Sequence, residues 1–183
     1  NGIVRGLVFC SRIDEAEELS RLFNLRGFNT LALSGGNSEE ERLDAIDRLE
    51  GDNHDKLDYI FSVDIFNEGV DIPSINQIIM LRPTQSAIIF VQQLGRGLRN
   101  ISSKEYLTVI DFIGNYQNNY MIPIALYGDD SYNKDTLRKL VTSNSSLIPG
   151  TSTVNFDEIS QQKIFDSINS NNFNQKKRSR SRT

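Results

Sequence analysis

Residues 7–23, LVFCSRIDEAEELSRLF, pass from a short apolar run into an amphipathic pattern. The run Leu7–Cys10 is typical of a strand that is buried on both faces of a sheet. Ser11, with Asp14 three residues later, predicts the capping box of a helix, and Gly27 predicts its end. Apolar residues recur at helical spacing between these signals, namely Ala16, Leu19, Leu22 and Phe23. The stretch therefore predicts the strand and helix that begin a βαβ unit.

The same alternation continues along the chain. Four further strands are predicted by apolar runs at residues 30–33, 58–63, 77–81 and 106–112. Ser38 and Glu41 predict a capping box that opens a second helix, and residues 85–94 predict another after Thr84. Three residues of the second helix are expected to face inward, namely Leu43, Ile46 and Leu49. Alternating strands and helices predict an α/β fold, a parallel sheet with helices on both faces.

From Gly128 onward Asn, Ser and Asp become frequent and apolar residues become rare. Two short amphipathic helices are predicted at about 134–141 and 158–168, on either side of a Pro149-Gly150 turn. The expected organisation is one α/β domain, the start of a mostly helical accessory region, and a basic disordered tail, at residues 1–127, 128–174 and 175–183.

The charge of the chain is unevenly distributed. The formal net charge is −4, but five of the 20 basic residues lie in the final eight positions, which leaves 15 bases against 24 acids, or −9, for residues 1–175. Such an acidic body argues against a broad non-specific nucleic-acid surface, so any contact with nucleic acid is expected to be local. The absence of a long apolar run predicts no membrane span. The single cysteine, Cys10, excludes an internal disulfide and predicts a buried, inert thiol in a cytoplasmic protein.

The stretch 92–99, QQLGRGLR, places two arginines three residues apart, just beyond a glycine. If it continues the preceding helix, both guanidinium groups lie on one face. Paired planar cations of this kind suit phosphate oxygens that gain charge during phosphoryl transfer. The alternative is a solvated basic turn.

The other candidate residues each follow a predicted strand, where ligands gather in open parallel sheets. Ser11 and Arg12 follow the first strand. The second leads through Ser34–Gly36 into a helix whose amides and dipole can hold a phosphate, the alternative being a flexible entry loop. After the third strand, Gly69 allows close backbone approach. Asp71 can accept from a ribose hydroxyl or orient an arginine, unless it is a simple turn cap.

Three blocks of sequence, in order, resemble conserved motifs of superfamily 2 helicases of the DEAD/DEAH type. The pattern Q-x-x-G-R-x-x-R over 92–99 resembles motif VI, residues 63–73 resemble motif V, and residues 6–12 resemble motif IV. Their order and spacing are those of the C-terminal RecA-like helicase domain, a P-loop NTPase-like second motor domain. Residues 111–116 and 122–126 further resemble a bacterial restriction-enzyme-like branch, whose members often carry a phospholipase-D-like nuclease domain.

The resemblance implies a role for each matching residue. Arg96 and Arg99 would act as catalytic arginine fingers. The residues expected to border the nucleotide are Gly69, Asp71, Gln92 and Gly95. Those expected to contact nucleic acid are Ser11, Arg12, Ser34, Gly35, Gly36, Ser62 and Val63. Val63 replaces the threonine that many relatives have in motif V, so Ser62 is the alternative source of that hydroxyl.

The expected function is that of the second motor domain of an ATP-dependent helicase or translocase. Gln92 and Leu98 resemble the DNA-directed branch, which favours DNA over RNA. No phosphate loop G-x-x-x-x-G-K-[ST] is present. ATP with Mg would therefore be held mainly by a first RecA-like domain of the same full-length chain, and this fragment alone is predicted to be inactive. His54 stands alone, which predicts no metal site.

Two alternatives remain open from the sequence. The first is a non-catalytic RecA-like module that binds nucleotide or nucleic acid without turnover, although the intact arginine pair argues against it. The second is a non-motor Rossmann-like enzyme, which should have a glycine-rich turn after its first strand. The stretch Cys10–Ile13 contains no glycine.

Overall fold

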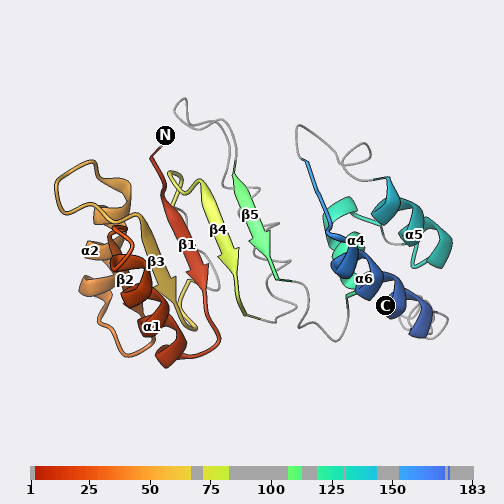
Figure 1. Cartoon of the computed structure of the whole chain (residues 1–183), viewed down its shortest axis with the longest axis horizontal. Helices are drawn as coiled ribbons and strands as arrows, with labels where there is room; N and C mark the ends of the chain where they lie inside the picture. The colour runs from red at the N-terminus through yellow and green to blue at the C-terminus, as the bar shows by residue number, and fades with distance from the viewer. Residues whose placement is uncertain are drawn as a thin grey trace, which may run out of the picture. The chain divides into compact units, whose positions relative to one another are not determined.

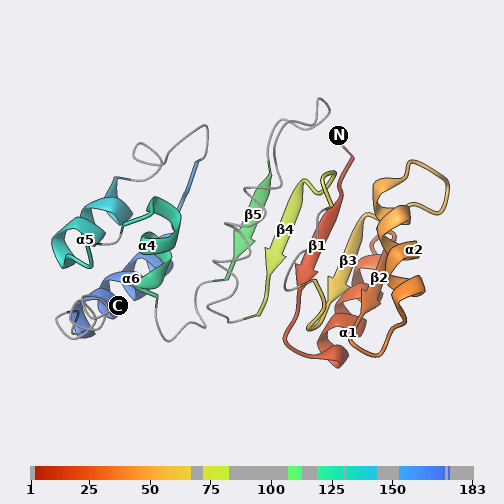
Figure 2. The same cartoon turned by 180° about the vertical axis from the view of Figure 1, so that it is seen from behind.

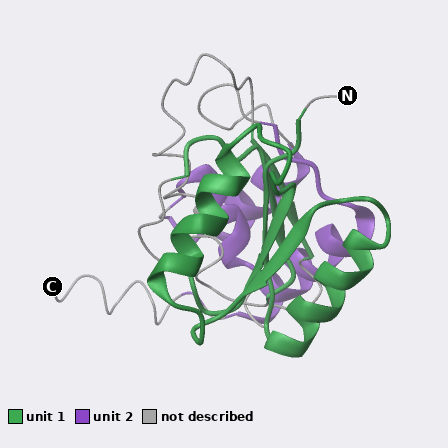
Figure 3. Cartoon of the chain, turned by 90° about the vertical axis from the view of Figure 1, so that its left-hand side faces the viewer, with its two compact units in different colours: residues 1–112 green, residues 113–183 purple. Residues whose placement is uncertain are grey.

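The computed structural model describes residues 3–66, 72–82, 107–112, 119–129, 131–143, 153–171 and 173. Contacts divide the chain into two compact units, residues 1–112 and 113–183, which Figure 3 distinguishes by colour. Each unit is described by itself.

The first unit is built on a parallel sheet. Its described strands are β1 (Gly6–Phe9), β2 (Thr30–Leu33), β3 (Tyr59–Ser62), β4 (Gln77–Met80) and β5 (Thr108–Asp111). They lie in the order β2-β3-β1-β4-β5, and every neighbouring pair is parallel (Figure 1). The five predicted strands and their parallel arrangement are therefore confirmed. Because all the strands run the same way, their carboxyl ends form one edge of the sheet.

Two described helices cover this sheet. Helix α1 (Ile13–Asn24) packs against β2 and β3, and α2 (Glu39–Glu50) contacts β3. They lie on opposite faces, since α1 is in front of the strands in Figure 1 and α2 is in front of them in Figure 2. The predicted arrangement with helices on both faces is confirmed. The helix expected over 85–94 lies outside the described residues.

The apolar run over 7–10 lies in the core of the first unit. Leu7, Val8, Phe9 and Cys10 are all at most 4% exposed, because alternate side chains of this central strand enter opposite faces of a covered sheet. On the α1 side, the ring of Phe23 packs edge-on against the rings of two β3 residues, with centroids 5.4 Å from Tyr59 and 5.1 Å from Phe61. Such aromatic pairs add to the burial energy.

Helix α2 begins where the sequence predicts, but the side chains that it buries differ from those expected. The capping box is present, since Ser38 Oγ accepts from Glu41 N and the Glu41 carboxylate accepts from Ser38 N. The inward orientation expected for Leu43 is wrong, because that side chain is 55% exposed. Ala45 and Leu49, four residues apart, are buried instead. At roughly 100° per residue, positions 43 and 49 lie about 120° apart around the helix axis.

The second unit is helical over its described residues. Helices α5 (Lys134–Thr142) and α6 (Glu158–Ser170) confirm the two expected ones. A third helix, α4 (Met121–Tyr127), has no counterpart among the expected elements, and Pro123 lies within it. Proline is tolerated there since it lies in the first turn, where its missing N–H costs no bond. Helix α4 packs against α5, and both lie in the compact unit of residues 113–183.

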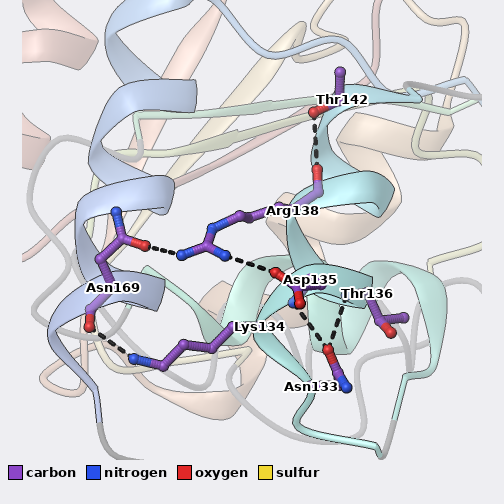
Figure 4. A network of polar contacts seen from close by, with 7 residues as sticks. All are labelled: Asn133, Lys134, Asp135, Thr136, Arg138, Thr142 and Asn169. Carbon is purple, nitrogen blue, oxygen red and sulfur yellow. Dashed lines mark hydrogen bonds and ion pairs between the residues drawn. The ribbon is translucent and has the colours of Figure 1, made fainter.

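Polar side chains tie α6 to α5 (Figure 4). Lys134 Nζ donates to the carbonyl of Asn169 in the last turn of α6, at 2.7 Å. Arg138 donates to the side-chain oxygen of Asn169 and, at 2.8 Å, to Asp135. A cation at the carboxyl end of a helix satisfies free carbonyls and complements the helix dipole. In this unit the basic residues therefore stabilise the packing of two helices.

Candidate functional site

The carboxyl edge of the sheet holds the predicted sites that the structure describes. Ser11 and Arg12 follow β1, Ser34–Gly36 follow β2, and Ser62–Val63 end β3. Segments that are far apart in sequence are thus brought to one edge, as expected for ligand-binding residues of a parallel sheet. The remaining predicted site residues lie outside the described part of the chain, namely Gly69, Asp71, Gln92, Gly95, Arg96 and Arg99.

The start of α1 differs from the prediction in one respect. The N-cap is Arg12, without a side-chain cap, so the capping box predicted for Ser11 and Asp14 is wrong. The carboxylate of Glu15 instead accepts from the backbone N–H of Ser11, at 2.9 Å. The reason is that the helix begins one residue later than the capping pattern required. Ser11 and Arg12 both remain exposed at the edge.

Arg12 presents its guanidinium group to solvent. Its Nε lies 3.0 Å from Asp14 Oδ1, and both side chains are about 70% exposed, at 71% and 72%. Ion pairs this exposed are weak because water screens them. A phosphate oxygen could therefore replace Asp14 as the partner of Arg12 at little cost in stability.

The loop after β2 is ordered by its own backbone. Asn37 Oδ1 accepts from Ser34 N at 2.8 Å, and Asn37 N donates back to Ser34 O at 3.1 Å. Gly35 and Gly36 are exposed at the tip of this turn. A Cβ added to Gly35 would meet nothing within 4 Å, and one added to Gly36 would meet only Ser34 Oγ, at 3.7 Å. Packing does not require these glycines, so what they provide is close access to the backbone from solvent.

Arg42, near the start of α2, forms hydrogen bonds with this loop. Its Nη2 donates to the carbonyls of Gly35 at 3.1 Å and Ser34 at 3.5 Å. Sequence reasoning missed Arg42. The available signal was an arginine just after the helix start, where its side chain can reach back to the entry loop.

The three glutamates that precede Arg42 would repel an anion that approached the same end of the helix. Residues 39, 40 and 41 are all glutamate. The pKa of Glu41 is lowered, chiefly by its hydrogen bond with the backbone of Ser38, so this carboxylate stays ionised. Like charges would repel a phosphate, which weakens the expected contribution of the helix dipole. Arg42 partly offsets this negative charge.

Ser62 and Val63 do not present their side chains at the surface. Ser62 is 1% exposed, and its hydroxyl donates to the carbonyl of Val8 on β1 at 3.3 Å. Val63 is packed in the core on the α1 side of the sheet. The physical reason is that β3 lies between two strands and under helices on both faces. This burial argues against Ser62 as a substitute hydroxyl for nucleic acid.

Three further observations concern the residues that the structure describes. Cys10 is buried, and desolvation, followed by the charge of Glu15, raises the pKa of its thiol to about 12. Its thiolate is therefore scarce at neutral pH. Within the described ranges, no group of three His, Cys, Asp or Glu side chains is placed to hold a metal ion. No described helix combines the length and apolar character needed to span a membrane.

The sequence matches one family model, described as the helicase conserved C-terminal domain, over residues 3–100. It is 35% identical over 104 residues to the putative ATP-dependent helicase IRC3 of Saccharomyces cerevisiae, an alignment that covers 56% of this chain and 15% of that protein. It is 30% identical over 112 residues to the putative ATP-dependent RNA helicase MJ1505 of Methanocaldococcus jannaschii, covering 57% of this chain and 14% of that protein.

A solved structure resembles the chain over a greater length. The yeast DEAD-box splicing factor Prp28 gives a TM-score of 0.54 at 16% identity, with 87% of this chain and 30% of that one covered. This likeness supports the fold alone. The chain spans 15% and 14% of the lengths of the two curated relatives.

Proposed function

The chain belongs to the family of helicase conserved C-terminal domains, and from this membership we propose that it is the second motor domain of an ATP-dependent nucleic-acid helicase or translocase. The observation that carries the proposal is the family match, which spans every described strand of the sheet except β5. The arrangement of polar residues along the carboxyl edge supports it.

The exposed part of that edge is assigned to nucleic acid. Arg12 offers a screened guanidinium group, and the Ser34–Gly36 turn offers open backbone that Arg42 braces. Backbone amides and single arginines contact phosphate oxygens without reading bases. An acidic protein can bind in this way, since the contacts are few and local. Ser62 and Val63 are buried, so their side chains would not contact nucleic acid and would only support the backbone at this edge.

The nucleotide side of the proposal rests on residues outside the described part of the chain. Arg96 and Arg99 would stabilise the charge that develops on the phosphoryl group, and Gly69, Asp71, Gln92 and Gly95 would border the nucleotide. Bound ATP with Mg supplies the phosphoanhydride bond whose hydrolysis drives the motor. The first RecA-like domain of the full-length protein would hold most of it. Closure of the two domains would bring the arginine pair to the phosphates.

The nature of the nucleic acid is a finer part of the proposal. Gln92 and Leu98 favour DNA, and residues 111–116 and 122–126 favour a restriction-like branch. The single cysteine, Cys10, favours a cytoplasmic protein. The printed name of MJ1505 is that of an RNA helicase, which supports RNA instead. The two substrates are distinguished by the ATPase activity of the full-length protein with single-stranded DNA, duplex DNA and RNA. The proposal expects stimulation by at least one of them, and none at all would favour the non-catalytic alternative.

The arginine pair is tested in the same assay. Changing Arg96 to Ala in the full-length protein should lower kcat about a thousandfold, because a finger acts on charge that develops in the transition state. Nucleic-acid affinity should change little. Arg96→Lys should not restore turnover, since a point charge cannot reproduce the planar fork. Loss of binding with kcat intact would show that the pair is a backbone clamp.

A further inference from the structure

Strand β2 has an outer side, the side that faces away from β3, with no neighbouring strand among those described. It is the last described strand on that side of the sheet (Figure 1). Leu33 turns its carbonyl to β3, where it accepts from Val63 N at 3.0 Å. Backbone groups of successive residues point to opposite sides of a strand, so Thr30, Ala32 and Ser34 turn theirs to the outer side.

Asn24 satisfies the outward backbone groups of Thr30. Its Oδ1 accepts from Thr30 N at 2.8 Å, and its Nδ2 donates to Thr30 O at 3.3 Å. One side-chain amide therefore forms the two hydrogen bonds that a residue of an antiparallel neighbouring strand would form with Thr30. This contact closes the position to such a strand.

The end of α1 places Asn24 beside β2. Asn24 is the last residue of α1, and its carbonyl accepts from Gly27 N at 3.0 Å. Gly27 has a φ of 88°, in the left-handed region that favours glycine after a helix. The chain turns back there and enters β2 only six residues after Asn24. The contact between Asn24 and Thr30 thus follows from a tight connection.

A second asparagine closes the other end of the outer side. Asn37 Oδ1 accepts from Ser34 N at 2.8 Å, and Asn37 N donates to Ser34 O at 3.1 Å. Ala32 lies between the two closed positions, and among the described residues no side chain bonds to its backbone. One open residue offers a single N–H and a single C=O, which is too little to hold an added strand.

The sequence of β2 does not protect this side by itself. A row of unpaired N–H and C=O groups is a template on which another chain can pair. Proteins usually protect such a strand with charged side chains or proline. The strand is Thr-Leu-Ala-Leu, with neither. Protection of the outer side must therefore come from residues outside the strand, and the two asparagines are placed to give it.

We propose that Asn24 prevents the chain from pairing with a second copy of itself through β2. Its amide occupies the hydrogen-bonding groups that Thr30 would otherwise offer to β2 of the second copy. Loss of Asn24 opens Thr30 beside Ala32, so that two alternate residues become available on one side. Two copies can then pair these strands antiparallel about a two-fold axis. The inference is independent of the proposed function, since Asn24 lies outside the candidate site.

The test is the mass of the full-length protein in solution, measured by sedimentation over a range of concentrations. Asn24→Ala and Asn24→Ser both lack the amide, and at high concentration each should have about twice the mass of wild type at the same concentration. Asn24→Asp should keep the wild-type mass. Its carboxylate still accepts from Thr30 N, and two like charges would meet if the strands paired.

Ser20→Ala is the matched control for a simple loss of stability. Ser20 is buried, and its Oγ lies 2.7 Å from Thr30 Oγ1. This contact involves the hydroxyl of Thr30, so its loss leaves the outward N–H and C=O bonded to Asn24. The variant should have a lower melting temperature and the wild-type mass. A doubled mass for Ser20→Ala would show that destabilisation alone causes association, which would overturn the role of Asn24.

Hydrogen exchange locates the contact between the two copies. At low concentration the Thr30 amide of Asn24→Ala should exchange roughly fivefold faster than in wild type, the effect of losing one ordinary hydrogen bond. At high concentration the amides of Thr30 and Ala32 should become protected. Association that leaves both amides unprotected would overturn the inference, and so would a wild-type mass for both Asn24→Ala and Asn24→Ser.

Discussion

Two arginines flank β1 at opposite edges of the sheet, and they are used differently. Arg5, at the amino edge, has a side chain that is 18% exposed and donates to the carbonyls of Leu49 and Glu50, which end α2, and to Asp52. Arg12, at the carboxyl edge, is 71% exposed, and its ion-pair partner among the described residues is Asp14, two positions away. One arginine holds two elements together, whereas the other faces solvent.

The contrast extends to the residues around each arginine. At the amino edge, Asn76 accepts from Arg5 N at 2.9 Å and donates to Ile3 O at 2.6 Å, so that edge is tied by side-chain bonds of long sequence range. At the carboxyl edge, the Ser34–Asn37 turn bonds mainly within itself. The amino edge therefore stabilises the fold, whereas the carboxyl edge leaves polar groups exposed, where we propose that nucleic acid binds. The lesson is that side-chain exposure and the sequence range of hydrogen bonds distinguish residues that stabilise the fold from those proposed to bind a ligand.

Two glycines give the strongest form of this comparison. A Cβ on Gly6 would lie 2.2 Å from Tyr59 Cδ1, because the Tyr59 ring crosses β1 and its hydroxyl donates to Gln77 at 2.5 Å. Gly6→Ala should therefore lower the free energy of unfolding by about 2–3 kcal/mol through overpacking. Gly36→Ala, whose Cβ would meet only Ser34 Oγ at 3.7 Å, should lower it by less than about 1 kcal/mol. Urea unfolding measures both, and equal losses would refute the distinction between the two edges.

The next effect is expected at the amino-edge arginine. Arg5→Met keeps the apolar stem but leaves the terminal carbonyls of α2 without their donor, which should cost about 1–2 kcal/mol of stability. Because Arg5 lies away from the carboxyl edge, nucleic-acid affinity should be unchanged. Urea unfolding and a binding titration on the same preparation check both parts. Weaker nucleic-acid binding with unchanged stability would mean that a ligand contact lies at the amino edge, contrary to the proposal.

A smaller effect is expected at the glycine turn. Gly36→Val should lower nucleic-acid affinity about fivefold, since a branched side chain would stand where a phosphate must approach the backbone. The melting temperature should stay within about 2 °C of wild type, because a Cβ at this position would meet only Ser34 Oγ, at 3.7 Å. Fluorescence anisotropy with labelled DNA and RNA gives the affinity. A wild-type affinity would remove the turn from the proposed contact surface.

Much of the fold could be predicted because its signals are local. The run over 7–10 and the Ser38–Glu41 capping box depend on neighbouring residues, and both predictions are confirmed. Strand order could not be predicted, since it depends on which strands pair across long separations. Helix α4 was not predicted, although Pro123 is tolerated in the first turn of a helix.

The position of the candidate residues at strand ends could be predicted from the sequence, but their burial and contacts could not. The positions of Arg12 and Ser34–Gly36 at strand ends followed from the alternation of strands and helices. The burial of Ser62 could not, because it depends on the strands that flank β3. Arg42 had a local signal, an arginine just after a helix start that can reach back to Gly35, whereas the ion pair between Arg82 and Asp64 joins residues 18 apart and has none.

The central claim is that the carboxyl edge holds the nucleic-acid contacts. The most direct measurement is the salt dependence of nucleic-acid affinity for the full-length protein and for its Arg12→Met and Arg5→Met variants. Arg12→Met should weaken binding about threefold at physiological salt and reduce the slope of log K against log salt by about 0.7–0.9, the loss of one phosphate contact. Arg5→Met should leave the slope unchanged. A slope that falls for Arg5→Met and not for Arg12→Met would contradict the account.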